Sequence, residues 1–409
     1  MIRDDNMTET VRHDLMRSTN MLSVFNCIRK HGPISKRRIQ EETGLSWGAV
    51  STFSADLLER GIISETGRVD TGSRRSATAF DINLENNLII GIDTNVIGMT
   101  GVIIDLKSRV KTKIHQELVS NHISELLEQM KGIIRLLMTE VSDRSVIKGI
   151  GVAFPGHVDT ERGVSVLARQ FCSLEPLDIC GILKGEFGLP VVIEHDPNCC
   201  ALSEQLFGAG QGLTNLLYVR LSRGIGMGII LGGEIYHGFA GATGEIGHIT
   251  MDPDGGPCYC GNNGCLEIYA SSEAVLSRCE QAARMGDAPR LAELLARGEP
   301  LTLETAEKAA AAGDGAVYDF FYRAADYAGL AVSAAINLLD PQAVILGGEM
   351  PDVKEPFYRH LREVIDRRVW NRRSIDIRVS HLGRSSAAIG AASLFIQQAF
   401  FSAVGPDAS

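Results

Sequence analysis

The first eighty residues place apolar side chains three or four positions apart, between short polar breaks. This spacing predicts three helices, over residues 15–30, 36–43 and 47–60. Ser35 and Ser46 stand where N-caps would accept backbone N–H groups, and Gly44 stands where a left-handed C-cap is needed. A strand over 62–66 and a return strand over 77–82 follow, with a polar turn between them. This order of elements is typical of a winged helix-turn-helix domain.

Beyond residue 87 the apolar positions come in longer runs that glycine-containing turns separate. Buried strands are predicted over 88–93, 100–105, 146–154, 190–194, 216–221, 225–231 and 343–346. Helical patterns lie between them, over 120–141, from the 190–194 strand to 208, over 271–312 and over 319–339. This alternation predicts a mixed α/β protein. We therefore expect a winged helix-turn-helix domain in residues 1–82, a linker in 83–87, an α/β domain in 88–400 and a tail in 401–409.

The third predicted helix would be the recognition helix, which enters the major groove of DNA N-terminus first. The residues expected to face base edges are Ser46, Trp47, Ala49 and Ser51. The residues expected to contact phosphates or a minor groove are Lys36, Arg37 and Arg38 on the preceding helix and Arg74 and Arg75 in the turn between the strands. An unrelated helical domain with scattered surface charge is the alternative. The glycine turn, the serine cap and both basic clusters together favour DNA binding.

Charge is unevenly distributed along the chain. Residues 1–85 hold twelve basic and twelve acidic side chains, so the formal net charge of −10 falls in the remaining residues. An acidic body would be repelled by nucleic acid, so any DNA contact should come from the N-terminal part. No apolar stretch is long enough for a membrane span, and the polar first twenty residues lack a signal-peptide core, so we expect a cytoplasmic protein without membrane contact.

The densest cluster of metal-binding residue types lies between residues 244 and 267. It reads Gly-Glu-Ile-Gly-His over 244–248 and Cys-Tyr-Cys-Gly-Asn-Asn-Gly-Cys-Leu-Glu over 258–267. One histidine and three cysteines form a closed set of four ligands that suits tetrahedral zinc and leaves no open position for water. We therefore predict a structural zinc ion bound by His248, Cys258, Cys260 and Cys265. Three buried thiols beside an unrelated histidine, or a redox pair, are the alternatives.

This pattern closely resembles the signature of the ROK family, named for repressors, open reading frames and kinases. The Pro-Gly pair at 155–156, the Glu-His-Asp-Pro-Asn segment at 194–198 and the Gly-Gly pair at 347–348 also resemble family segments. The resemblance covers residues 88 to about 400 and implies a two-lobed, actin-like ATPase fold with a cleft between two α/β lobes. ROK members with an N-terminal winged helix-turn-helix domain are typically sugar-responsive repressors of carbohydrate genes.

The resemblance also implies a sugar-binding site. The family's sugar contacts correspond to Asp196, Glu245, His248 and Glu267, and His195 stands where ROK kinases usually carry asparagine. Carboxylates accept hydrogen bonds from vicinal hydroxyls, and an unmet buried acceptor is costly, so such a site can discriminate between sugars. His248 would place one ring nitrogen on zinc and the other toward a sugar hydroxyl. Solvated loop acids are the alternative for Glu245 and Glu267, and a helix N-cap for Asp196.

Kinase activity is the main functional alternative, because Asp196 matches the general base of ROK kinases. The phosphate loops depart from the family pattern. Asp-x-Gly-Gly-Thr is replaced by Asp-Thr-Asn-Val-Ile at 93–97, and Gly-Thr-Gly by Ser-Arg-Gly at 222–224. Glycines let backbone N–H groups approach phosphates, so we interpret Asp196 as a vestigial base and expect no enzyme activity. The alternative is a ROK-type kinase that phosphorylates a hexose or N-acetylhexosamine with ATP.

The expected partners are operator DNA and a small sugar or sugar derivative that acts as effector. A regulator that answers to a protein partner is a further alternative. Two recognition helices must lie about 34–36 Å apart to enter successive major grooves, which favours a homodimer or homotetramer. Sugar binding would close the lobes and alter this spacing, to the extent that the sugar prefers the closed state.

Overall fold

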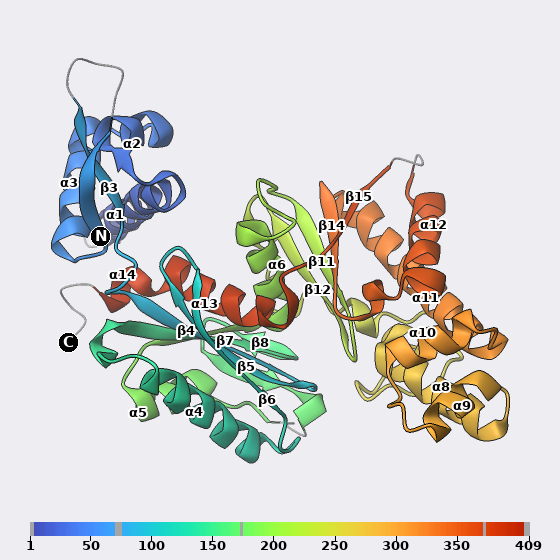
Figure 1. Cartoon of the computed structure of the whole chain (residues 1–409). Coiled ribbons are helices and arrows are strands. Elements are labelled where there is room, and N and C mark those ends of the chain that lie inside the picture. The colour runs from blue at the N-terminus through green and yellow to red at the C-terminus, as the bar shows by residue number, and fades with distance from the viewer. Residues whose placement is uncertain (1–3, 70–75, 172–174, 371–373, 405–409) are drawn as a thin grey trace.

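The computed structural model describes residues 4–69, 76–171, 175–370 and 374–404, and it places a small N-terminal domain beside two α/β lobes (Figure 1). The N-terminal domain contains helices α1 (Asp4–His31), α2 (Lys36–Thr43) and α3 (Trp47–Glu59). Its sheet has the order β1-β3-β2, with β1 at Ile34–Ser35, β2 at Ile63–Val69 and β3 at Ala77–Ile82. None of the helices in the described ranges is long and apolar enough to cross a membrane.

The predicted starts of the second and third helices are confirmed by their caps, whereas the first helix begins at Asp4 and not at the predicted residue 15. Ser35 Oγ accepts the N–H of Arg38, and Ser46 Oγ accepts the N–H of Ala49. Gly44 has a φ of 69°, the left-handed conformation that a glycine adopts without steric cost. These local interactions set the short turn between α2 and α3, which is the central feature of a helix-turn-helix unit.

The first lobe contains a mixed five-stranded sheet of order β10-β7-β4-β5-β6. Its strands are β4 (Leu88–Asn95), β5 (Gly98–Asp105), β6 (Val110–Glu117), β7 (Ile147–Phe154) and β10 (Val191–His195). The small hairpin of β8 (His157–Asp159) and β9 (Val164–Leu167) lies beside it. Helices α4 (Ile123–Thr139) and α5 (Ile179–Phe187) share one apolar core with the sheet. Helix α13 (Ser386–Gln398) covers the other face.

The second lobe repeats the same sheet plan, in the order β13-β12-β11-β14-β15. Its strands are β11 (Leu216–Leu221), β12 (Ile225–Leu231), β13 (Glu234–Ile235), β14 (Ala343–Gly347) and β15 (Asp376–Val379). In both lobes three antiparallel strands are followed by two parallel ones. The lobe's helices are α7 (Glu267–Ala270), α8 (Ser272–Met285), α9 (Pro289–Ala296), α10 (Leu303–Ala311), α11 (Gly315–Leu339) and α12 (Arg359–Arg368). This duplicated plan is that of the actin-like fold expected from the sequence.

Helices α6 (Asp196–Phe207) and α13 pack together between the two sheets. Helix α13 can approach the first sheet closely because Gly91 and Gly151 lie beneath it. A Cβ at either glycine would lie 2.0 Å from a carbonyl oxygen of the helix, that of Ala388 or Ala391. Helix α6 rests in the same way on Gly228 of β12, where a Cβ would lie 2.1 Å from the carbonyl oxygen of Pro197. The two helices therefore form the layer that connects the two sheets.

The N-terminal domain is packed onto the first lobe through one continuous apolar core. Phe25 of α1 lies 6.2 Å and 5.3 Å, between ring centroids, from Phe400 and Phe401 of α14 (Phe400–Ala403). Arg29, one turn further along α1, donates a 2.6 Å hydrogen bond to Ser108 Oγ in the β5–β6 turn. Burial lowers the pKa of Arg29 to about 10. Helix α14 thus extends into the stretch 401–409 that the sequence predicts as a tail, because Phe400 and Phe401 fill the junction.

We predict that Phe400→Ala weakens this junction. The ring is fully buried, so its removal leaves a cavity and should lower the free energy of unfolding by about 3 kcal/mol. Urea denaturation of the full chain measures the effect. Phe239→Ala is the matched control, because Phe239 is fully exposed and its loss should change stability by less than about 0.5 kcal/mol. Equal midpoints for the two variants would contradict the assignment of Phe400 to the core.

Candidate functional site

The predicted metal ligands come together beside the start of α7. The candidate ligand atoms of His248, Cys258, Cys260 and Cys265 all lie within 4.8 Å of one another. Cys258 Sγ lies 3.6 Å from His248 Nδ1, and Cys260 Sγ lies 3.6 Å from Cys265 Sγ. A tetrahedral ion with metal–sulfur bonds of about 2.3 Å requires sulfur–sulfur edges of about 3.8 Å. The four residues can therefore hold a metal ion.

Glycines allow the cysteine loop to fold around this group. Gly261 and Gly264 have φ values of 95° and 65°, and a Cβ at Gly264 would lie 1.6 Å from the carbonyl oxygen of Asp252. Burial raises the pKa of Cys265 to about 12 and also raises that of Cys258. Both free thiols therefore hold their protons at neutral pH, and a metal ion must displace them on binding.

The expected sugar contacts line a polar site at the same end of the second sheet. Asp196 begins α6 and is fully buried, and His195 Nε2 lies 3.5 Å from Asp196 Oδ1 and 3.9 Å from Glu245 Oε1. Glu267, at the start of α7, accepts the Ile225 N–H at 2.7 Å, and burial raises its pKa. The structure thus brings His195, Asp196 and Glu245 into one group.

Tyr259 connects the metal ligands to this group, a role that the sequence reasoning missed. Its hydroxyl lies 3.3 Å from His248 Nε2, the ring nitrogen that does not face Cys258. Burial raises the pKa of Tyr259, and so does a hydrogen bond to Glu267, so the phenol stays protonated. The Nε2 of His248, expected to face a sugar hydroxyl, therefore meets a protein hydroxyl in this structure.

Arg220 is a second residue that the sequence reasoning missed. It lies on β11, and its guanidinium forms an ion pair with the carboxylate of Asp196. Asp93, at the start of the first phosphate loop, is buried nearby, and its pKa is raised to about 7 by burial and by the charge of Asp196. A charged residue inside an otherwise apolar buried strand was the available signal, because such residues are rare unless paired.

The two segments interpreted as altered phosphate loops make different contacts. Asn95 Oδ1 accepts the N–H groups of Ile97 at 2.9 Å and Gly98 at 3.3 Å, and Asn95 Nδ2 donates to Asp93. In the second loop Arg223 is half exposed and lies 3.6 Å from a carboxylate oxygen of Glu273.

The predicted DNA-contacting residues that the structure describes lie on α2 and at the start of α3. Trp47 is 53% exposed at the start of α3, and Arg37 and Arg38 are exposed on α2, where they pair with Glu41 and Glu42. Ser46 is engaged as an N-cap, and the others are half-buried: Lys36 donates to Ser51 Oγ at 3.4 Å, and Ala49 packs against the core. Thr52 is exposed on α3 and was not predicted. Arg74 and Arg75 lie outside the described residues.

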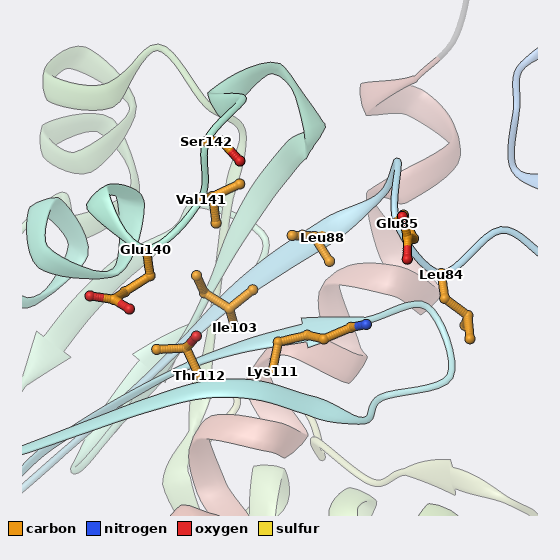
Figure 2. A pocket seen from close by; sticks show the side chains of 9 residues that line it. All are labelled: Leu84, Glu85, Leu88, Ile103, Lys111, Thr112, Glu140, Val141 and Ser142. Atoms are coloured by element: carbon orange, nitrogen blue, oxygen red, sulfur yellow. The ribbon is translucent and has the colours of Figure 1, made fainter.

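An open hollow of about 240 Å³ lies away from these sites, at the edge of the first lobe (Figure 2). It is bordered by Leu84 and Glu85, where the chain leaves the N-terminal domain, and by Lys111 of β6. It is also bordered by Glu140 and Val141, which follow α4. None of the predicted site residues in the described ranges lines this hollow. It therefore contributes nothing to the chemistry of the cleft.

Comparison with known proteins matches both parts of the chain. The ROK family model matches residues 89–398, and a winged helix-turn-helix DNA-binding model matches residues 17–64. The DNA-binding transcriptional dual regulator NagC of Escherichia coli is 31% identical over 83% of this chain and 82% of its own length. A xylose repressor of Bacillus spizizenii is 27% identical over 93% of this chain and 96% of its own.

The chain is similar to a solved regulator structure and to a solved kinase structure, and the two matches cover different shares of the chain. A ROK family transcriptional regulator, a homologue of the E. coli MLC protein, covers 95% of this chain and 98% of its own with a TM-score of 0.79 and 26% identity. A ROK family glucokinase from Streptomyces griseus, in complex with glucose and AMPPNP, covers 76% of this chain and 100% of its own with a TM-score of 0.66 and 28% identity. The chain therefore belongs to the ROK family, and it carries a winged helix-turn-helix DNA-binding domain at its N-terminus.

Proposed function

We propose that this protein is a transcriptional repressor whose DNA affinity is controlled by a sugar bound between its lobes. The observation that carries the proposal is the fusion of a winged helix-turn-helix domain to a ROK domain. The match with the MLC homologue extends over both parts and covers 95% of this chain. Relatives named xylose repressor and N-acetylglucosamine repressor make a pentose or an N-acetylhexosamine the first effectors to test. In this proposal residues 1–82 bind operator DNA, residues 83–87 connect, and residues 88–400 bind the effector.

The proposed sugar site consists of His195, Asp196, Glu245, His248 and Glu267. Buried carboxylates can accept hydrogen bonds from sugar hydroxyls, and leaving such an acceptor unpaired costs about 1–3 kcal/mol, so the site can reject sugars of the wrong stereochemistry. The loop that carries three of these residues is also the metal-binding loop. We propose zinc as the ion, because three thiolates and one imidazole suit it. Its role here is structural: His248, Cys258, Cys260 and Cys265 would hold the loop in place.

The absence of kinase activity is part of the proposal. Phosphoryl transfer requires backbone N–H groups to cradle the nucleotide phosphates. In this chain the Asn95 side chain already accepts the N–H groups of Ile97 and Gly98 in the first loop. Arg223 of the second loop lies 3.6 Å from a carboxylate oxygen of Glu273. These contacts favour a sensor over a kinase, although Asp196 keeps the position of the base.

Helix α6 offers a direct route from the sugar site to the DNA-binding domain. It begins at Asp196 and ends at Phe207, whose ring lies 5.8 Å from the guanidinium of Arg29 on α1. A shift of α6 on sugar binding would therefore move α1. In a homodimer or homotetramer this motion would change the separation of the recognition helices from the roughly 34–36 Å that successive major grooves require.

The zinc assignment predicts that Cys258→Ser and Cys265→Ser each lose the ion and lower the melting temperature. Loss of one thiolate opens a closed four-ligand site, so the loop loses its cross-link. Metal analysis of the purified protein by mass spectrometry should find about one zinc per wild-type chain. Cys180→Ser is the control, because Cys180 lies outside the cluster and should leave zinc content unchanged. Full zinc content in both cluster variants would refute the ligand set.

The DNA-binding assignment predicts that Arg37→Ala with Arg38→Ala weakens binding to all sequences alike. Each lost phosphate contact should reduce the slope of log affinity against log salt by about 0.9. Fluorescence anisotropy at several salt concentrations, on operator and random duplexes, measures both effects. Lys184→Ala on α5, which removes a positive charge from the first lobe, is the control and should not change the slope. An unchanged slope in the double variant would remove α2 from the DNA contact surface.

The sensor assignment predicts no ADP release with ATP and a panel of xylose, glucose and N-acetylglucosamine. At least one sugar should instead change operator affinity about fivefold or more. Asp196→Asn is the reference for both assays, since it removes the charge and replaces one acceptor oxygen with an NH₂ donor while keeping the side-chain shape. Turnover in the wild type that disappears in Asp196→Asn would identify a kinase. A full sugar panel without effect on DNA binding would reject a sugar-controlled regulator.

A further inference from the structure

Arg220 is held in an unusual position in the second sheet. It pairs with Gly226 of β12 and with Gly347 of β14, so its neighbours on both sides carry no side chain. Helix α6 rests on the same place, since a Cβ at Gly226 would lie 2.7 Å from Pro197 Cγ. The long side chain of Arg220 therefore has room to lie beneath the first turn of α6 and reach Asp196.

The charges around Arg220 do not balance without it. Asp93 and Asp196 are both buried, and they come from different elements, the end of β4 and the start of α6. Burial would lower the pKa of Arg220, but Asp196 and Asp93 together raise it, so the guanidinium stays charged. The ion pair of Arg220 and Asp196 thus joins the second sheet to the start of α6, and the buried Asp93 of β4 is close enough for its charge to act on both groups.

The place of these residues matters for the chemistry of the cleft. Asp93 opens the first phosphate loop and Asp196 matches the family's base, so a phosphoryl group in transfer would have to pass between them. In a kinase, Mg²⁺ supplies positive charge to that space when the nucleotide is bound. In this chain a protein cation is already bound to Asp196. Asp196 Oδ1 is buried, has His195 Nε2 at 3.5 Å and makes no hydrogen bond with the described residues, so it can accept a ligand hydroxyl.

We propose that Arg220 is a positioning residue that takes the place of a metal ion beside Asp196, balances the buried negative charge of Asp196 and Asp93, and fixes Asp196 as a hydrogen-bond acceptor for a sugar hydroxyl. The sugar-binding part rests on the proposed function. The part in which Arg220 takes the place of a metal cation does not rest on the proposed function. It can be tested without sugar or DNA. Removing the guanidinium should leave two buried carboxylates that need a cation, and Mg²⁺ is the natural replacement because it prefers oxygen ligands.

The test measures the melting temperature of the full-length, zinc-loaded protein in MgCl₂ and in NaCl of equal ionic strength. The wild type should melt at the same temperature in both salts. Arg220→Thr should melt at a lower temperature than the wild type in NaCl and recover a substantial part of the loss in MgCl₂. Arg220→Lys, which keeps the charge, should behave as the wild type. The gain in MgCl₂ should disappear in Arg220→Thr combined with Asp196→Asn.

Arg220→Gln provides the same test with a longer side chain in case Arg220→Thr does not fold. No response to Mg²⁺ in a folded neutral variant, or an equal response in the wild type, would overturn the proposal. Operator binding without sugar separates this result from the proposed function. A variant that binds DNA normally but ignores Mg²⁺ rejects only the role of Arg220, whereas a wild type that does not bind DNA rejects the regulator.

Discussion

The packing of helix α1 into the core of the first lobe is the contact on which the arrangement of the molecule depends. Apolar residues of the DNA-binding domain, the first sheet, α13 and α14 form one continuous cluster, with Phe25 and Phe400 near its centre. Arg29 adds polar contacts at the margin, to Ser108 and through it to Ser393 on α13. Lys107 of the β5–β6 turn also pairs with Asp81 of β3 at 2.6 Å. A domain fixed by a shared core moves with the lobe that it joins.

Most of the fold could be predicted from the sequence, because its signals are local. The caps at Ser35, Ser46 and Gly44 and the long apolar strands are set by residues a few positions apart. Strand β6 was missed because it is an edge strand with exposed, charged positions such as Lys111 and Lys113, so it lacks an apolar run. The helical stretch predicted over 271–312 is divided into three helices, the first of which ends at a left-handed Gly286.

The same distinction between local sequence signals and long-range contacts applies to the candidate site. The four candidate metal ligands share one loop, so their spacing alone predicted that they meet. Arg220, Asn95 and Tyr259 act through residues far away in sequence or through loop geometry, and only the folded chain shows their contacts. Asn95 illustrates the difference, because its substitution for glycine was visible but its capture of two backbone N–H groups was not.

The position of α13 and α14 has a consequence for the order in which the protein can be made. Both helices come after the second lobe in the chain, yet they complete the core of the first lobe and of its junction with the DNA-binding domain. During synthesis, the first sheet must therefore wait with one face uncovered until almost the whole chain has left the ribosome. The proposed sugar site and the DNA-binding domain therefore reach their final relative arrangement only at the end of translation. Incomplete chains would lack the geometry that connects a bound sugar to an operator.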